Sequence, residues 1–356
     1  MAQTDTTRIV TFDGTQATGS TGYVAAGMLR ELHRRLPDEH ARDHFLSDTD
    51  VFAGTSAGAA NALFFAMADD ADAALDYIIQ FWKQATIVAA KSGTDLFRMI
   101  GTVLGVSAVL NTEAIKGVYI DYFGSAKLGD LKRKVAITSF QLDTPNRVHR
   151  SWHPKVFHNF DENDPDMDEL VVDVLMRSGS PPLLTPIYQS SNNDGPGYID
   201  GGVWANNPSM VALTQVLSDR SLLSTGPNTD GITMLSVGNG NAPIYAAPRF
   251  RNGFGNWGYF RWLLDPFQIG LVLDVLLAAD EAANNKQSET MLGDQYLRLN
   301  PLLPKPMVGF TSEAIDEVID KVLSLENTQA QITATMDWLD RVGWYRDSAA
   351  AVARVS

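Results

Sequence analysis

The hydrophobic pattern at the start of the chain predicts a strand, a turn and a helix in succession. Residues 8–12 form a short β-rich run, and the glycine-bearing turn Asp13-Gly14 follows it directly. Apolar residues then recur at helical spacing over residues 24–36, and Pro37 closes that segment. We therefore expect one strand-turn-helix unit before Pro37.

A second unit of the same kind follows immediately. Residues 50–53 are typical of a strand, residues 54–58 of a tight turn and residues 59–67 of a buried helix. Two such units in succession predict parallel strands flanked by helices. The alternation continues, with strands expected at residues 135–142, 148–157 and 232–237, and helices at residues 169–177, 313–325 and 329–339. The sequence thus predicts an α/β fold with a mostly parallel central sheet flanked by helices.

The length of the chain is compatible with one domain. Its 356 residues exceed the usual size of a domain, but α/β enzymes with one central sheet often run this long. No internal repeat or long low-complexity tract divides the sequence. We expect a single domain over residues 1–356, with a catalytic core at about residues 7–310 and C-terminal helices at about residues 311–345.

Composition and charge narrow the classes of partner. Hydrophobic residues make up 45% of the chain and charged residues 20%, which leaves ample apolar material for a core. The formal net charge is -14 at pH 7 and the longest basic run is Lys132-Arg133-Lys134, so we expect no nucleic-acid partner. The same acidity disfavours electrostatic adsorption to anionic lipid, so any transient contact with a membrane surface must be mainly apolar.

Several absences limit the chemistry further. The chain has no cysteine, which excludes disulfides, thiolate metal sites and cysteine catalysis, and we expect neither a metal nor a cofactor. Residues 1–10 lack the basic and apolar regions of a secretory signal, so we expect a cytoplasmic protein, with secretion by a signal-less route left open. The most apolar stretch, residues 269–279, is too short to span a bilayer and carries Asp274, so a core or interfacial helix is expected there.

The second turn carries the candidate nucleophile. Its sequence, Gly54-Thr55-Ser56-Ala57-Gly58, matches G-x-S-x-G between a strand and a helix of small residues, which is the context of a nucleophile elbow. Glycines at the flanking positions leave room for the strained turn that exposes the serine hydroxyl. The next helix directs its N-terminus at the reacting oxygen, so the N–H of Ala57 is a natural oxyanion donor. We expect Ser56 to be the nucleophile.

The identity of the base decides the type of mechanism. All six histidines lie between His33 and His158, whereas the histidine of an α/β-hydrolase triad follows the serine and the acid, so none is singled out, although a histidine base stays open. Asp200 is a carboxylate alternative, because it ends a short strand and precedes Gly201 and Gly202. An Asp-Gly pair by itself favours an ordinary turn. Combined with the serine motif and the histidine positions, Asp200 becomes the expected base.

Together these motifs resemble those of the patatin-like phospholipases. The resemblance covers most of the chain and rests on the serine motif and on these segments: Asp13-Gly14, Arg177-Ser178-Gly179-Ser180-Pro181-Pro182, Asp200-Gly201-Gly202, Asn206-Asn207-Pro208 and Tyr296-Leu297-Arg298-Leu299-Asn300-Pro301. It implies a three-layer α/β/α fold. It also implies a Ser-Asp dyad formed by Ser56 and Asp200.

The first turn departs from the family pattern. The family's loop reads D-G-G-G-x-R/K-G and supplies an anion hole, whereas this chain has Asp13-Gly14-Thr15-Gln16-Ala17-Thr18-Gly19. Glycines and the basic residue of that pattern are missing here. Backbone N–H groups still supply donors, so Gly14, Thr15 and Gln16 stay candidates for the oxyanion hole beside Ala57.

The expected function is that of a serine acyl hydrolase that cleaves lipid acyl esters. It would act in lipid degradation as a phospholipase A or lysophospholipase with nonspecific esterase activity. The aromatic-rich residues 257–267 form either an acyl-chain groove or plain core packing. Two alternatives stay open: an acyltransferase with the same dyad, in which an alcohol or thiol replaces water, and a catalytically impaired lipid-binding protein, suggested by the altered first turn.

Overall fold

A seven-stranded sheet forms the centre of the computed structural model, which describes residues 6–15, 22–92, 110, 112–144, 149–189, 195–219, 228–243, 245, 257–263 and 271–345. The strand order is β4-β3-β2-β1-β6-β7, and β5 pairs with β3 beside this path. The strands are β1 (Thr7–Phe12), β2 (Val51–Thr55), β3 (Lys134–Gln141), β4 (His153–His158), β5 (Tyr198–Asp200), β6 (Ile232–Val237) and β7 (Tyr296–Leu299).

Most of the sheet is parallel, as the sequence predicts. β1 pairs in parallel with β2 and β6, β2 with β3, and β6 with β7, whereas β4 and β5 run antiparallel to β3. Every residue of β2 and β6 is buried, as expected for strands that helices cover on both faces. The carboxyl ends of the parallel strands meet at one edge of the sheet, here called the carboxyl edge. This is the usual location of an α/β active site.

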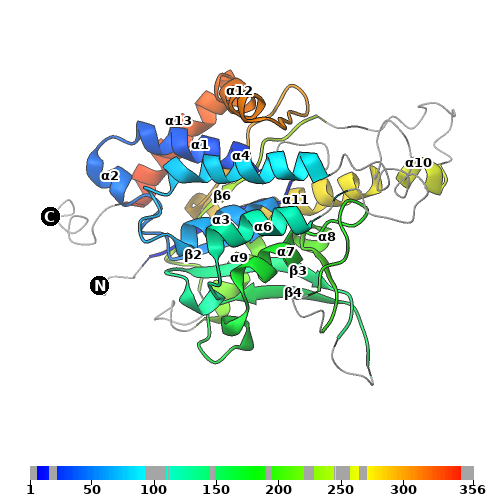
Figure 1. Cartoon of the computed structure of the whole chain (residues 1–356). Helices are drawn as coiled ribbons and strands as arrows, with labels where there is room; N and C mark the ends of the chain where they lie inside the picture. The colour runs from blue at the N-terminus through cyan, green and yellow to red at the C-terminus, as the bar shows by residue number, and fades with distance from the viewer. Residues whose placement is uncertain are drawn as a thin grey trace.

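Helices cover both faces of the sheet (Figure 1) and confirm the predicted α/β/α layering. One face carries α1 (Gly22–Arg35), α3 (Ala57–Met67), α4 (Leu75–Ser92), α6 (Glu113–Phe123), α7 (Val171–Ser178), α12 (Ser312–Leu323) and α13 (Glu326–Val342). The other face carries α8 (Gly202–Ala205), α9 (Ser209–Ser218) and α11 (Leu271–Leu292). Two short helices, α2 (Glu39–Asp43) and α10 (Tyr259–Leu263), lie at the periphery. Among the described residues, no helix has the length and apolar character needed to cross a membrane.

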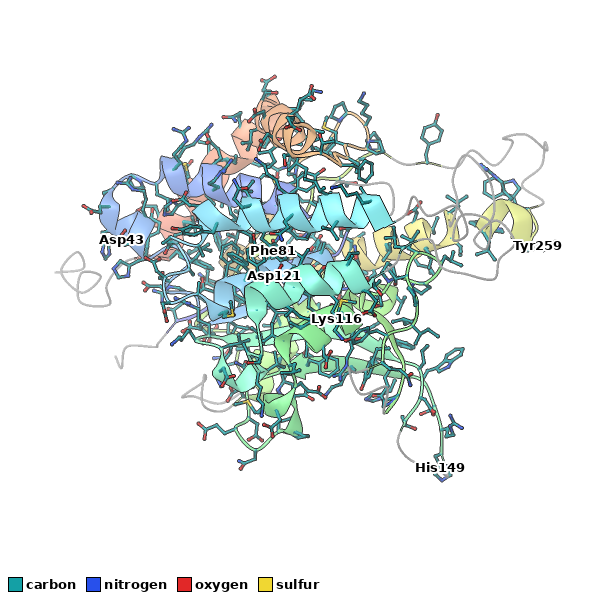
Figure 2. The ribbon with its side chains drawn as sticks, viewed as in Figure 1. Asp43, Phe81, Lys116, Asp121, His149 and Tyr259 are labelled. Carbon is teal, nitrogen blue, oxygen red and sulfur yellow. The ribbon has the colours of Figure 1, made fainter. Side chains whose placement is uncertain are left out.

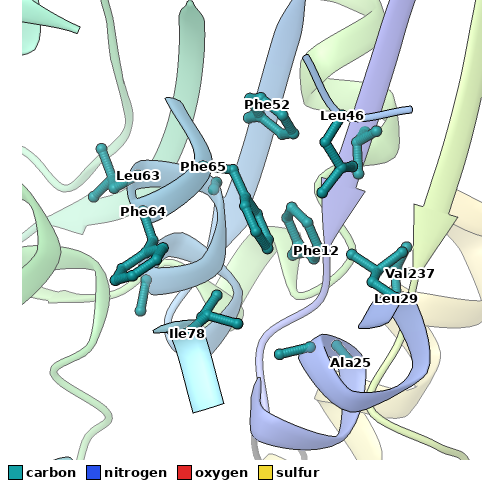
Figure 3. Packing of buried hydrophobic residues seen from close by; sticks show 14 of the residues in the cluster. Phe12, Ala25, Leu29, Leu46, Phe52, Leu63, Phe64, Phe65, Ile78 and Val237 are labelled. Carbon is teal, nitrogen blue, oxygen red and sulfur yellow. The ribbon is translucent and has the colours of Figure 1, made fainter. Parts of the chain in front are cut away.

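Aromatic packing ties the end of β1 to the helix that follows Ser56 (Figure 3). Phe12, the last residue of β1, packs on Phe65 of α3 with 5.8 Å between ring centroids and on Phe52 of β2 with 6.4 Å. All three side chains are fully buried, and aromatic pairs at such separations add to the stabilisation from buried area. Because Asp13 directly follows Phe12, this packing fixes the point at which the chain leaves β1.

Several predicted boundaries differ from the structure by a few residues, and two of the differences have identifiable reasons. The helix expected to begin at residue 59 begins at Ala57, because the residues directly after Ser56 already form its first turn. The strand expected over residues 148–157 begins only at His153, because its pairing with β3 starts opposite Gln141, the last residue of β3. Within the predicted single domain, β7 extends the sheet to Leu299, and the extent of the domain beyond the sheet stays a prediction.

Candidate active site

Ser56 lies between β2 and α3 at the carboxyl edge and has an unusual backbone conformation. Its φ is 53° and its ψ is -118°, and a positive φ is uncommon for a residue with a side chain. Close approach of neighbouring backbone explains the flanking glycines. A Cβ at Gly54 would lie 2.3 Å from the carbonyl oxygen of Gly58, and a Cβ at Gly58 would lie 2.1 Å from that of Phe12. These two glycines therefore allow the tight turn that holds Ser56 half-buried at the end of β2.

The buried hydroxyl of Ser178 holds the backbone of Ser56. Ser178 ends α7, and its Oγ accepts a hydrogen bond from the Ser56 N–H at 2.8 Å. The next backbone donor belongs to Ala57, the first residue of α3, and the first N–H groups of a helix have no partner within that helix. The sequence places Ser178 in a family-like segment, but it does not reveal this hydrogen bond, because Ser56 and Ser178 are 122 positions apart.

Asp200 ends β5, and the structure brings its side chain to Ser56. Antiparallel pairing places Asp200 opposite Ser139 near the end of β3, and the residue is only 6% exposed. Its carboxylate accepts a hydrogen bond from the N–H of Gly202 at 2.7 Å, while Gly201 packs against β3. Burial raises the pKa of Asp200 to about 6, and the nearby Ser56 hydroxyl and the Gly202 N–H oppose this rise. The carboxylate is therefore a stronger base than an exposed aspartate.

The first turn, residues 13–15, also lies at the carboxyl edge, where β1 ends. The N–H of Gly14 donates to the carbonyl oxygen of Asn206 at 2.9 Å, so this donor already has a partner within the protein. Thr15 follows and is half-buried. Gln16, the remaining candidate of the predicted oxyanion loop, lies outside the described residues.

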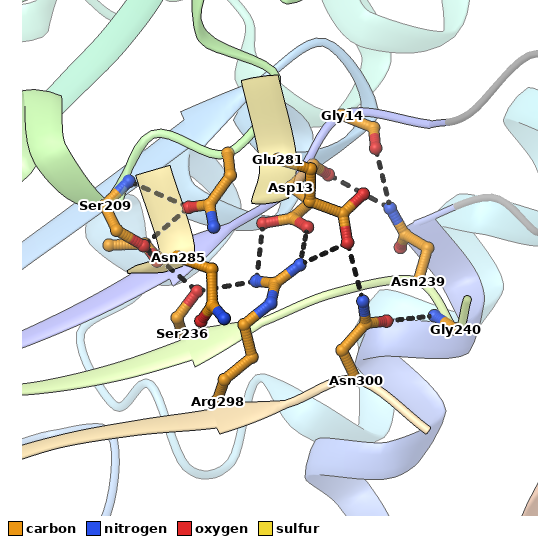
Figure 4. A network of polar contacts seen from close by, with 12 residues as sticks. Asp13, Gly14, Ser209, Ser236, Asn239, Gly240, Glu281, Asn285, Arg298 and Asn300 are labelled. Atoms are coloured by element: carbon orange, nitrogen blue, oxygen red, sulfur yellow. Dashed lines mark hydrogen bonds and ion pairs between the residues drawn. The ribbon is translucent and has the colours of Figure 1, made fainter. Parts of the chain in front are cut away.

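An arginine from β7 binds the carboxylate of Asp13 (Figure 4). Arg298 Nη1 lies 3.0 Å from Asp13 Oδ1, and Nη2 contacts Oδ2. Nη2 also donates to Glu281 Oε1 at 2.7 Å, and Nη1 donates to Ser236 Oγ at 2.8 Å. Burial alone would lower the pKa of Arg298, but the charges of Asp13 and Glu281 outweigh it and raise that pKa. Burial also raises the pKa of Asp13 to about 7, with Arg298 opposing the rise and Glu281 adding to it.

The histidines lie on other parts of the molecule. His33 Nε2 lies 3.1 Å from the carbonyl oxygen of Arg42 in the region of α1 and α2. His158 of β4 lies 3.6 Å from Asp164. His149 lies at the periphery, at the tip of an outlying segment (Figure 2). The partners of His33 and His158 thus lie outside the serine turn, and the expectation of a non-histidine base stays a prediction.

The aromatic stretch at residues 257–267 is described only in part. Trp257 and Trp262 pack edge to face with 5.2 Å between ring centroids, and the Arg261 guanidinium lies 5.0 Å from the centroid of Trp257. Tyr259 is exposed and lies at the outer end of α10 (Figure 2). None of the described residues of this aromatic stretch belongs to the two hydrophobic clusters that cover the sheet. Leu264 and Phe267 lie outside the described residues.

One group of described side chains has the spacing of metal ligands. Potential ligand atoms of His158, Asp164 and Asp166 lie within 4.8 Å of one another. The ammonium group of Lys155 lies 2.7 Å from both carboxylate oxygens of Asp166, so a cation already neutralises part of this group. His158 and Asp164 also line a cavity of about 790 Å³ whose lining residues do not include Ser56 or Asp200. We therefore assign this group no part in the candidate active site.

Comparison with known proteins identifies the family. The family described as patatin-like phospholipase matches residues 16–213, more than half of the chain. Protein teg of Priestia megaterium is 26% identical over 348 residues, covering 90% of this chain and 94% of that protein. Patatin-like protein 1 of Arabidopsis thaliana is 23% identical over 320 residues (82% and 74%), and probable inactive patatin-like protein 9 of the same plant is 24% identical over 258 residues (68% and 62%). The chain therefore belongs to the patatin-like phospholipase family, and this membership implies lipid acyl hydrolase activity.

Proposed function

We propose that this protein is a serine acyl hydrolase in which Ser56 is the nucleophile and Asp200 is the general base. The observation that carries the proposal is the proximity of these two side chains, through which the Ser56 hydroxyl lowers the pKa of the buried Asp200 carboxylate. Ser56 has the surroundings of a nucleophile elbow, with a strand before it, a positive φ and a helix after it. Asp200 suits the role of base, because it lies near the Ser56 hydroxyl and burial raises its pKa to about 6.

The reaction begins with the transfer of the Ser56 hydroxyl proton to Asp200. Oγ attacks the ester carbonyl carbon, the bond to the alcohol oxygen breaks, and the alcohol leaves with the proton from Asp200. The acyl group is then an ester of Ser56. Water attacks this ester while Asp200 accepts the water proton, and the proton returns to Oγ as the fatty acid is released.

Backbone donors at the carboxyl edge stabilise the oxyanion in both steps. The N–H of Ala57 stands at the N-terminus of α3, where the helix dipole also favours negative charge. Gly14 already donates to Asn206, so we assign the second donor to the N–H of Thr15 or Gln16. Any of these residues has the required N–H group, which explains how the turn can serve without the family's further glycines.

The proposed substrates are lipid acyl esters of the phospholipase A or lysophospholipase type. Exposed apolar side chains support a transient, mainly apolar contact with a lipid surface. Leu183 and Ile187 follow α7, and Val275 and Leu276 lie on α11, which packs on α8 directly after Asp200. With a net charge of -14, the protein gains little from electrostatic attraction to anionic lipid.

The Ser56→Ala variant tests the nucleophile. A fluorophosphonate probe should label the wild-type protein and the control Ser218→Ala, in which an exposed hydroxyl of α9 is removed, but not Ser56→Ala. Hydrolysis of short nitrophenyl esters should follow the same pattern. Labelling and turnover that persist in Ser56→Ala would exclude Ser56 as the nucleophile. A wild-type protein that neither reacts nor turns over would favour the impaired lipid-binding alternative, and acyl transfer to an added alcohol would favour the acyltransferase.

A further inference from the structure

Side chains from other elements hold the first turn in place. Asn239, which follows β6, donates from Nδ2 to the carbonyl oxygens of Asp13 at 3.0 Å and Gly14 at 3.3 Å. Arg298 of β7 binds the Asp13 carboxylate with both terminal nitrogens, and Glu281 of α11 is a second carboxylate on the same guanidinium (Figure 4). The turn is thus anchored by its surroundings, although it lacks glycines and the basic residue of the family pattern.

The contact between Arg298 and Asp13 is buried and directional. The two side chains are 12% and 3% exposed. A guanidinium presents a planar fork that matches both oxygens of a carboxylate, whereas a lysine ammonium is a single point of charge. Glu281 is itself oriented by Asn300, whose Nδ2 donates to its Oε1 at 2.7 Å. Asp13 therefore cannot move without losing charge-assisted hydrogen bonds in a buried site.

A displacement of Asp13 would reach the serine turn directly. A Cβ at Gly58 would lie 2.1 Å from the carbonyl oxygen of Phe12 and 2.6 Å from that of Asp13, so the two turns are in close contact. The N–H of Thr15, a proposed oxyanion donor, follows Asp13 by two peptide units. A misplacement of about 1 Å in a catalytic group costs on the order of 100-fold in rate.

We propose that Arg298 is a positioning residue that fixes the first turn beside Ser56 through the carboxylate of Asp13. The inference rests on the proposed function, because it is the first turn that supplies an oxyanion donor. Arg298 acts through Asp13 and does not touch the reacting atoms.

The Arg298→Lys variant tests this role. It keeps the positive charge and most of the apolar stem, but it cannot contact both oxygens of Asp13. We expect kcat for a short nitrophenyl ester to fall by about 100-fold while KM changes by less than about threefold, because the donor acts in the transition state. The matched control is Arg133→Lys, which should retain the wild-type kcat. Arg133 directly precedes β3, and its half-buried guanidinium donates to the carbonyl oxygens of Ala68 and Ser47.

A double variant shows whether both residues act through one contact. Asp13→Ala removes the same contact and leaves Arg298 paired with Glu281, so no buried charge is left alone. If the turn is fixed by this contact, Asp13→Ala/Arg298→Lys should be no slower than the slower single variant. Losses that multiply would overturn the proposal, as would a wild-type kcat in a folded Arg298→Lys.

Hydrogen exchange separates this proposal from the proposed function. In a peptide that contains Asp13, Gly14 and Thr15, exchange should be faster in Arg298→Lys than in the wild type and in Arg133→Lys. This result is expected whether or not Ser56 is the nucleophile. Unchanged exchange would overturn the positioning role even in an active enzyme. A wild-type protein that does not react with fluorophosphonate would overturn the proposed function instead. The exchange rates would still show whether Arg298 fixes the first turn.

Discussion

Asp13 and Asp200 are two buried aspartates at the same edge of the sheet, and their surroundings differ in one respect. Burial raises the pKa of both, to about 7 for Asp13 and about 6 for Asp200. Asp13 faces the guanidinium of Arg298, which contacts both of its oxygens. For Asp200, the groups that favour the charged form are the Ser56 hydroxyl and the Gly202 N–H, with no cation among them in the described part of the chain.

This difference suits Asp13 to anchoring the first turn and Asp200 to accepting a proton. A carboxylate that is bound by both arms of a guanidinium loses strong hydrogen bonds when it moves or takes up a proton. A carboxylate that is held by a hydroxyl and one N–H has, as one of its partners, the very group whose proton it must accept. We interpret Asp13 as the anchor of the first turn and Asp200 as the base, whose unfavourable burial serves its function.

The assignment of Asp200 as the base would fail most clearly if Asp200 could be replaced without loss of activity. Asp200→Asn keeps the shape of the side chain but cannot accept the Ser56 proton. We expect kcat/KM on nitrophenyl esters to fall by about 10²–10⁴-fold, which is the usual contribution of a general base. The double variant with Ser56→Ala should be little worse than the Ser56 variant, because nucleophile and base act as a unit. A near-normal rate in Asp200→Asn would require another base.

The same substitution tests the cost of burying the base. Because the pKa of Asp200 rises from 3.8 to about 6 on folding, stability is highest below the first value and is lost as pH rises through the second. A neutral asparagine avoids this cost, which is on the order of 3 kcal/mol above the folded pKa. We expect Asp200→Asn to melt at a higher temperature than the wild type at about pH 8, and the difference to close at about pH 4. An equal difference at both pH values would contradict burial as the cause.

The sequence predicts the sheet well where strands are short buried apolar runs that end in glycine-bearing turns. β1, β2 and β6 all have this pattern, and the structure has them close to the expected residues. The predicted start of β4 is too early, because the strand begins where it pairs with Gln141 of β3, and no local pattern encodes that pairing. Apolar runs and the turns that end them therefore predict the positions of β1, β2 and β6, whereas the start of β4 depends on long-range pairing.

The same limit applies to the candidate site. Ser56 and Asp200 are each named by a local motif, and the structure brings them together, although their roles stay a proposal. Ser178 and Arg298 lie in segments that resemble the family, but the sequence does not show their contacts, which join residues 122 and 285 positions apart. The sequence shows that the first turn departs from the family pattern, but it does not show that a distant arginine binds the carboxylate of Asp13.

The support of the nucleophile gives a smaller expected effect. Ser178→Ala leaves the Ser56 N–H buried without its acceptor, and this costs about 1–3 kcal/mol, or roughly 10–100-fold in kcat if the loss falls on the transition state. The matched control is Ser180→Ala, because the Ser180 hydroxyl is also buried in the same segment but donates to the carbonyl oxygen of Met176. Equal kinetics for the two variants would show that Ser178 does not support Ser56 in catalysis.

A smaller effect is expected from the pH dependence of the wild-type enzyme. The base must be ionised to accept the proton, so kcat/KM should fall as pH drops through the Asp200 pKa of about 6. From pH 7 to pH 5 the ionised fraction falls by about tenfold, and the rate should follow it. Asp13 titrates in the same range, so the profile should also be measured in Asp13→Ala, where the fall near pH 6 should persist on a lower rate. Its disappearance in that variant would assign the titration to the anchor rather than to the base.

The profile alone does not identify the titrating group, because an ordinary imidazole titrates at about pH 6.5, close to the value for Asp200. Single alanine variants of the histidines resolve this ambiguity. The proposed mechanism uses no imidazole, so each variant should keep kcat/KM within about twofold and leave the midpoint of the profile unchanged. The positions to test are His33, His40, His44, His149, His153 and His158. If one variant loses activity as fully as Ser56→Ala, a histidine is the base, and Asp200 would then orient the site without accepting the proton.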